Sequence, residues 1–199
     1  MFRKKKIIAI ITARKGSKGI KNKNIKNLNG YPLLAYTINY AKKSKLIDRV
    51  FVTTDGEKIS SISKKFNAET IIRPKKLSND TSMNDLAVTH AIKHIKKNLN
   101  YDFNYVVLLQ PTTPLRKKGE LDKAIKYAIS NKFDTVFSSI NYNPFLWRVK
   151  NKKMKPYSYN PFKRKIRQKL NDFNETGSYY ISKKEVYLKF NNRFGKNVS

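Results

Sequence analysis

The sequence predicts a three-layer α/β fold in which helices cover both faces of a mostly parallel sheet. Short apolar, β-branched runs of strand length recur from Ile7 to Ser139, and segments with the helical spacing of apolar residues separate them. Such alternation produces parallel strands joined by crossover helices. The expected strands are 7–12, 49–54, 69–72, 105–109 and 134–139, and the expected helices are 31–44, 57–66, 84–98 and 119–131.

Each of the first four expected strands has a clear reason to end. The run Ile7–Thr12 passes into a glycine-bearing basic loop, and Arg49–Thr54 reaches the turn pair Asp55-Gly56. The strand at 69–72 is stopped by Pro74, and that at 105–109 is followed by two prolines, Pro111 and Pro114.

The expected helices carry apolar residues at intervals of three and four. The first is entered through Pro32, which suits the first turn of a helix because its ring fixes φ. The periodic apolar positions are Leu33, Leu34, Ile38 and Ala41 in the first helix, Ile59, Ile62 and Phe66 in the second, and Ala87, Val88, Ala91, Ile92 and Ile95 in the third.

The alternation breaks near Asn141. A hairpin of 147–150 and 154–159, a strand at 177–182 and a short helix at 183–190 are expected. We expect residues 1–199 to form a single domain, from which the segment 141–168 leaves the sheet as an arm that contributes to a homodimer.

Composition excludes several classes of protein. The chain has no cysteine, so disulfides and thiolate sites are absent. No apolar run approaches the roughly 20 residues of a membrane span, and the basic start precedes only five apolar residues, which argues against a signal peptide. We expect a cytoplasmic protein with no membrane partner.

The net charge of +31 raises the hypothesis of nucleic-acid binding. The Lys and Arg residues are spread along the whole chain, so we interpret most of them as a solvated surface and expect no specific nucleic acid. The cluster from Arg14 to Lys26 is the exception, because glycines and cations after a buried strand can hold a polyphosphate.

Unusual polar segments follow the first four expected strands. Because ligands bind beyond the carboxyl ends of the strands in an open α/β sheet, a nucleotide site is expected at this edge. Each segment alone is also compatible with ordinary turn and cap chemistry. The segments are Thr12–Asn24, Thr53–Gly56, Arg73–Ser82 and Gln110–Arg116.

In order and spacing, TARKGSKGIKNKN, VTTDG, RPKKLSNDTS and LLQPTTPLR resemble the acylneuraminate cytidylyltransferases, also called CMP-sialic acid or nonulosonic acid synthetases. The resemblance implies a fold like that of the nucleotide-diphospho-sugar transferases. It also implies that CMP passes from CTP to the anomeric hydroxyl of an acidic nine-carbon sugar, such as sialic, legionaminic or pseudaminic acid, with release of pyrophosphate. Such a reaction serves surface glycan or lipopolysaccharide synthesis.

The resemblance also implies roles for individual residues. Lys23, Arg14 and Lys18 are the expected catalytic cations at the phosphates, with Lys23 at the α-phosphate. The sugar is expected to contact Gln110 and Thr112, and Arg167 suits its carboxylate because a guanidinium binds it bidentately. The residues implied in holding the nucleotide are Ser17, Asn24, Arg73, Asp80, Ser82 and Asn84.

The sequence departs from the family pattern in two places. Members usually carry an Asp-x-Asp pair that binds Mg²⁺, and this sequence contains none, so Mg²⁺ is expected without identified ligands and activity is expected to be reduced. Members usually show Asn-Gly where this chain has Thr176-Gly177, which leaves the identity of the sugar open. An impaired CTP-binding relative and a basic nucleic-acid-binding protein are the alternatives.

Three further residues have competing interpretations. His90 and His94 lie one helical turn apart, a spacing that metal sites use, although an ordinary helix face explains them more simply. Arg116 closes the last motif and is equally compatible with a solvent-facing position.

Overall fold

The computed structural model describes residues 2–17, 19–79, 82–142, 144–164, 166 and 171–199. The chain forms two compact units. The first consists of Met1–Phe137 with Gly177–Ser199, and the second is Ser138–Thr176. The segment 141–168, which we expected to leave the sheet, lies within the second unit.

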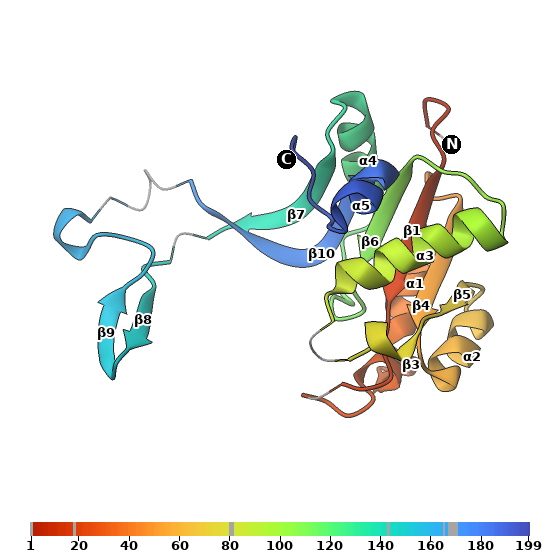
Figure 1. Cartoon of the computed structure of the whole chain (residues 1–199), viewed down its shortest axis with the longest axis horizontal. Helices are drawn as coiled ribbons and strands as arrows, with labels where there is room; N and C mark the ends of the chain where they lie inside the picture. The colour runs from red at the N-terminus through yellow and green to blue at the C-terminus, as the bar shows by residue number, and fades with distance from the viewer. Residues whose placement is uncertain (1, 18, 80–81, 143, 165, 167–170) are drawn as a thin grey trace. The chain divides into compact units, whose positions relative to one another are not determined.

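A six-stranded sheet with the order β5-β4-β1-β6-β10-β7 forms the centre of the fold (Figure 1). The central strand β1 pairs in parallel with β4 and β6, β4 pairs in parallel with β5, and β10 runs antiparallel to β6. The expected α/β class with a mostly parallel sheet is confirmed. The strands are β1 (Ile7–Thr12), β4 (Arg49–Thr54), β5 (Glu69–Ile72), β6 (Tyr105–Leu109), β7 (Thr135–Asn141) and β10 (Phe173–Lys183).

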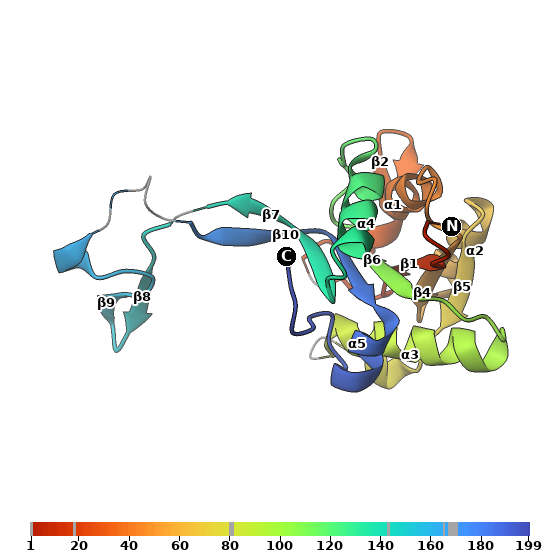
Figure 2. The same ribbon diagram turned by 90° about the horizontal axis from the view of Figure 1, so that it is seen from above.

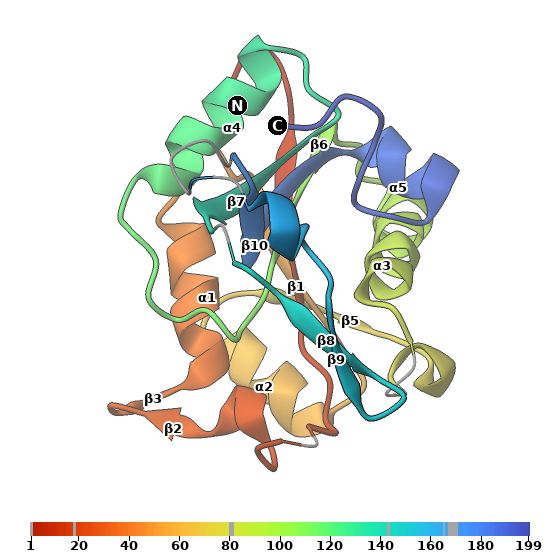
Figure 3. The same ribbon diagram turned by 90° about the vertical axis from the view of Figure 1, so that its left-hand side faces the viewer.

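Helices cover both faces of the sheet and complete the three layers. Figures 2 and 3 show α1 and α4 on one face and α3 and α5 on the other, and α2 belongs to the core on the face of α1. The helices are α1 (Leu33–Lys42), α2 (Glu57–Lys65), α3 (Asn84–Asn98), α4 (Glu120–Ser130) and α5 (Lys184–Phe190).

Side chains of β1 alternate between the two cores. Ile7, Ala9 and Ile11 pack with α1 and α4, and Ile8 and Ile10 pack with α3 and α5. All five are fully buried, as expected for a strand covered on both faces. None of the helices formed by the described residues has both the length and the apolar character needed to cross a bilayer.

The start of the first helix differs from the sequence-based expectation. Residues Tyr31–Pro32 form a short strand, β3, which pairs with β2 (Asn27–Leu28), so the first helix begins at Leu33. The turn between them is Asn29-Gly30, with φ values of 46° and 88°. Asn-Gly with positive φ at both positions is the strongest short hairpin signal, and it could have been found in the sequence.

The final segment of the chain packs on the outer side of β7. Backbone hydrogen bonds join Thr135 to Asn197 and Ser199, and Thr135 forms a parallel bridge with Val198. The Asp134 carboxylate accepts from the backbone N–H groups of residues 196 and 197 at 3.2 and 3.1 Å. This segment therefore extends the sheet at its β7 edge.

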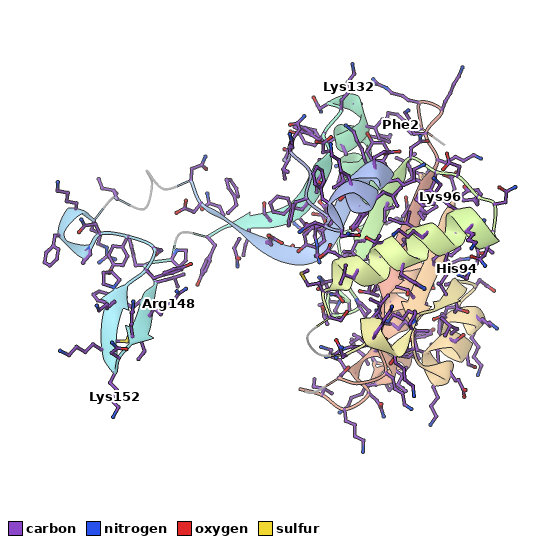
Figure 4. All side chains as sticks on the ribbon, viewed as in Figure 1. Phe2, His94, Lys96, Lys132, Arg148 and Lys152 are labelled. Atoms are coloured by element: carbon purple, nitrogen blue, oxygen red, sulfur yellow. The ribbon has the colours of Figure 1, made fainter. Side chains whose placement is uncertain are left out.

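The second unit contains a hairpin of β8 (Trp147–Lys150) and β9 (Lys153–Pro156). Its turn residues Asn151 and Lys152 have φ values of 53° and 57°, and Figure 4 shows Lys152 extending from the turn. Aromatic rings pack beside the hairpin, with 4.7 Å between the ring centroids of Phe145 and Tyr159. The unit also exposes apolar side chains, among them Phe162 at 95%.

Candidate functional site

Strand register brings the four polar segments to one edge of the sheet. Ile11 is level with Val52 on one side and Leu109 on the other, and Thr54 is level with Ile72. The loops that leave β1, β4, β5 and β6 therefore start from neighbouring positions, as ligand sites of open α/β sheets do.

The loop after β1 is held by two side chains. The backbone N–H of Lys15 donates to Asp55 Oδ1 at 2.9 Å, and Asn24 Nδ2 donates to the carbonyl oxygen of Arg14 at 3.0 Å. Asn24 is buried in the middle of a short 3-10 helix, Lys23–Ile25, which follows Asn22, whose φ is 56°. Since the Asn24 amide bonds the loop itself, we assign it a role in shaping the loop in addition to the expected contact with the nucleotide.

A cavity of roughly 410 Å³ opens between this loop and the start of α2. Arg14 and Lys15 contribute positive charge to its wall, and Asp55 and Glu57 contribute negative charge. Ser17 and Lys23, which we expected to hold the triphosphate, lie in the same loop and are half-buried. Their roles remain predictions.

Arg73 is the most deeply buried of the cations that the structure describes at this edge, with 5% of its surface exposed. Burial lowers the pKa of its guanidinium, and the charge of Arg14 lowers it further while Asp55 opposes the shift. Arg14 in turn lies 3.5 Å from the carbonyl oxygen of Ser78. The first loop, the turn after β4 and the segment after β5 thus meet around Arg73.

Several buried polar atoms in the segment after β5 and on α3 have no hydrogen-bond partner among the described residues. Within the part of the chain that the structure describes, they include Arg73 Nε, Ser78 Oγ, Ser82 Oγ and His90 Nδ1. A buried polar atom is normally paired, so we interpret this group as a candidate place for a ligand to supply the partners. Asn84 begins α3 beside Ser82 and is exposed.

The charge of Arg73 acts on His90, so His90 lies near this site. The sequence pattern indicated only a candidate metal pair with His94 and did not identify His90 as a residue of the nucleotide site. Burial lowers the pKa of His90, and the nearby His94 and Arg73 lower it further, so the imidazole is neutral at pH 7. The His90 and His94 ring centroids are 6.4 Å apart. No group of three or more His, Cys, Asp or Glu that could hold a metal occurs among the described residues, so the pair has no third ligand there.

Gln110 follows β6 and lies against β10. A Cβ added at Gly177, whose φ is 69°, would lie 3.3 Å from Gln110 Oε1, so the amide of Gln110 occupies the space beside this glycine that a side chain would need. Thr112 is exposed in the same loop. Their expected contact with a sugar stays a prediction.

Arg116 does not point to solvent. Its guanidinium is mostly buried and hydrogen-bonds to the backbone of Gln110 and Ser178, as well as to the Thr37 hydroxyl. The cation also lies 5.3 Å from the centre of the Tyr40 ring. The sequence motif places an arginine after the prolines, but only the fold shows what it contacts.

Three of the expected site residues, Lys18, Asp80 and Arg167, lie outside the described residues. The described residues do not contain a cluster of carboxylates that could hold Mg²⁺, so no ligands are assigned to this ion. Cations elsewhere are dispersed, and Figure 4 shows Lys96 on α3 and Lys132 after α4 pointing away from the ribbon.

Comparisons with known proteins agree with this fold and identify its family. The cytidylyltransferase family matches residues 8–196. N-acylneuraminate cytidylyltransferase of Escherichia coli O18:K1:H7 is 33% identical over 197 residues, which cover 96% of this chain and 45% of that protein. Pseudaminic acid cytidylyltransferase of Campylobacter jejuni (strain 81-176) is 29% identical over 188 residues, covering 92% of this chain and 81% of the relative.

The chain spans less than half of the E. coli relative and most of the Campylobacter one. Among solved structures, a CMP:2-keto-3-deoxy-manno-octonic acid synthetase complexed with CTP superposes with a TM-score of 0.72 at 14% identity, over 93% of this chain and 77% of the other. A 4-diphosphocytidyl-2C-methyl-D-erythritol synthase superposes with a TM-score of 0.67 at 10% identity, over 97% and 82%. These two show the fold, and the family match shows that the chain belongs to the cytidylyltransferases.

Proposed function

We propose that this protein transfers CMP from CTP to the anomeric hydroxyl of an acidic nonulosonic sugar and releases pyrophosphate. The observation that carries the proposal is the site around Arg73. It combines a buried guanidinium, unpartnered buried polar atoms and a neighbouring cationic loop at the ligand-binding edge of the sheet. The family assignment supplies the nucleotide, and the named relatives supply the sugar class.

In the proposed reaction the sugar hydroxyl oxygen forms a bond to the α-phosphorus of CTP while the bond to the bridging oxygen of pyrophosphate breaks. The hydroxyl proton is lost to solvent. Arg14 and Lys23 neutralise charge on the triphosphate, because phosphoryl transfer depends mainly on positioning and electrostatic stabilisation. Arg73, Ser78 and Ser82 bind the cytidine through the polar atoms that lack partners.

The second unit supports a further part of the proposal, a homodimer. It exposes Val149, Tyr157 and Phe162 at 67%, 60% and 95%, and exposed apolar groups on so small a unit favour association. The nucleotide-sugar product would serve the synthesis of a surface glycan.

The test is pyrophosphate release by the full chain with CTP, MgCl₂ and a panel of sialic, legionaminic and pseudaminic acids. Release with one of these sugars, and preference for CTP over ATP, supports the proposal. CTP binding without turnover with any sugar identifies an impaired relative. Binding that falls steeply with salt and does not distinguish CTP from ATP identifies a nucleic-acid-binding protein instead.

A further inference from the structure

The guanidinium of Arg116 joins the residue that follows β6 to a residue within β10. Its Nη2 donates to the carbonyl oxygens of Gln110 at 2.7 Å and Ser178 at 2.9 Å, and its Nε donates to the same Ser178 carbonyl and to Ser178 Oγ, both at 3.1 Å. Nη1 donates to Thr37 Oγ1 on α1 at 3.0 Å. All three guanidinium nitrogens of Arg116 therefore donate hydrogen bonds to other parts of the protein, and we call this arrangement the fork.

The partners of this cation are neutral. The ion pairs formed by the described residues do not include Arg116. Burial lowers its pKa to about 10, and the nearby Tyr40 and Glu120 oppose this shift, so the charge persists at neutral pH. Hydrogen-bonded carbonyl oxygens and the Tyr40 ring face stabilise the cation directly. An arginine held this way serves geometry, because all of its hydrogen-bond partners are carbonyl or hydroxyl oxygens and none is a carboxylate.

The Arg116 guanidinium lies where the pairing of β6 with β10 ends. The antiparallel ladder of β6 and β10 ends at the pair Leu109 and Tyr179. The next residues, Gln110 and Ser178, are the ones whose carbonyl oxygens Arg116 bridges. Arg116 thus fixes the backbone at the position where the ladder stops, in the stretch that brings the Gln110 amide against Gly177.

We propose that Arg116 is a positioning residue that fixes Gln110 for the acidic sugar and leaves binding of the nucleotide unaffected. This inference rests on the proposed function. Arg116 touches neither substrate in this proposal and acts only through the backbone of Gln110 and its neighbour across the strands. The fork geometry is essential, since a lysine keeps the charge and cannot bridge two carbonyls in the same way.

The first experiment measures both Michaelis constants for Arg116→Lys in the full chain. We expect the KM for the sugar to rise about tenfold or more, because small displacements of a positioning group cost one to two orders of magnitude. The KM for CTP should stay within about twofold. The control is Lys117→Met, which removes an exposed neighbouring cation. Equal rises of both constants, or no change in either, overturn the proposal.

A double substitution tests the route through Gln110. Gln110→Ala alone should raise the KM for the sugar, and adding Arg116→Lys should then have little further effect, because residues that act as a unit are not additive. If the two effects multiply, Arg116 does not act through Gln110 and the proposal is wrong.

A backbone measurement separates this inference from the proposed function. If the unsubstituted chain releases no pyrophosphate, the proposed reaction fails. The rate of backbone amide hydrogen exchange in residues 108–113 and 177–181 can still show whether Arg116 holds these two segments in place. Arg116→Lys should speed exchange in both segments and Lys117→Met in neither. Unchanged exchange in Arg116→Lys means that the guanidinium does not position this corner, and the inference fails.

Discussion

The carboxylate of Asp85 accepts two hydrogen bonds, each of 2.9 Å, from Nε and Nη2 of Arg193. The two side chains are only 10% and 13% exposed. Burial alone lowers the pKa of Arg193, and the hydrogen bonds and charge of Asp85 more than offset this, so the pKa is raised overall. The pair joins the first turn of α3 to the final segment of the chain.

Breaking this pair should destabilise the protein strongly. Asp85→Asn leaves a buried guanidinium without its counter-charge, and we expect a loss of about 3–5 kcal/mol in the free energy of unfolding in urea. The control is Glu69→Gln, which breaks the more exposed pair with Arg49 and should cost at most about 1 kcal/mol. Equal losses in the free energy of unfolding for the two variants would show that burial does not make the Asp85–Arg193 pair more important for stability than the exposed pair.

Lys23 should matter for catalysis more than its neighbours. Lys23→Met is expected to lower kcat by about 10²–10³, the cost of removing one preorganised group that stabilises charge in the transition state. Lys21→Met, which removes an exposed cation from the same loop, should leave kcat within about threefold. Steady-state kinetics with the active sugar checks both, and similar losses would assign the effect to the charge of the loop as a whole.

Arg73 should be important for function and costly for stability. Arg73→Met removes a buried charge whose guanidinium forms no ion pair with the described residues, so the free energy of unfolding should stay within about 1 kcal/mol or rise. The KM for CTP should increase by at least about tenfold, since a charged hydrogen-bonding partner of the nucleotide is lost. Strong destabilisation with an unchanged KM for CTP would make Arg73 a purely structural residue.

The contact between Gly177 and Gln110 can be tested with a matched pair of glycines. Gly177 and Gly119 have φ values of 69° and 77°, so an alanine strains either backbone by about 1–2 kcal/mol. Only at Gly177 would the new methyl group press on Gln110 Oε1, whereas nothing lies within 4 Å at Gly119. Gly177→Ala should raise the KM for the sugar and Gly119→Ala should not. If both variants change the KM for the sugar equally, backbone strain and not the contact with Gln110 is the cause.

Asp134 should make the protein sensitive to acid. The Lys183 ammonium at 2.8 Å and the backbone N–H groups of Asn197 and Lys196 hold the pKa of this carboxyl below its usual range. Its stabilisation is therefore complete above about pH 5 and is lost as pH falls through the lowered native pKa.

Thermal unfolding between pH 7 and pH 2 measures this contribution of Asp134. Asp134→Asn should lower the Tm at pH 7, and the difference from the unsubstituted protein should shrink toward the acid end. Glu57→Gln, at an exposed carboxylate, serves as the control. A difference in Tm that stays constant with pH would show that the lost stability comes from packing and not from ionisation.

Local sequence predicts the centre of this fold well and its connections less well. The runs that form β1, β4, β5, β6 and α3 have the bounds expected from periodicity, because those elements are fixed by their own apolar residues and by the turn residues beside them. The antiparallel insertion of β10 between β6 and β7 was not expected, because the residues of 173–183 do not by themselves determine which strands β10 pairs with.

The same distinction applies to the site. Motif order placed Arg14, Arg73 and Gln110 at one edge of the sheet, and the register of the strands brings them there. The fork of Arg116 depends on Ser178, which lies 62 positions along the chain, and the pair of Asp85 and Arg193 spans 108 positions. Neither partner can be chosen by local pattern, because many polar residues lie at comparable separations.

The place of β10 in the sheet has a consequence for synthesis on the ribosome. Strand β6 can pair with β1 once both have emerged, but in the folded sheet its other edge is covered by β10. Translation from Leu109 to Lys183 takes roughly 4–15 s at about 5–20 residues per second. Throughout that interval the nascent chain presents an open strand edge rich in valine and leucine, which can pair with other chains. Yield in cells should therefore respond to chaperone supply and to the speed of translation through the second unit.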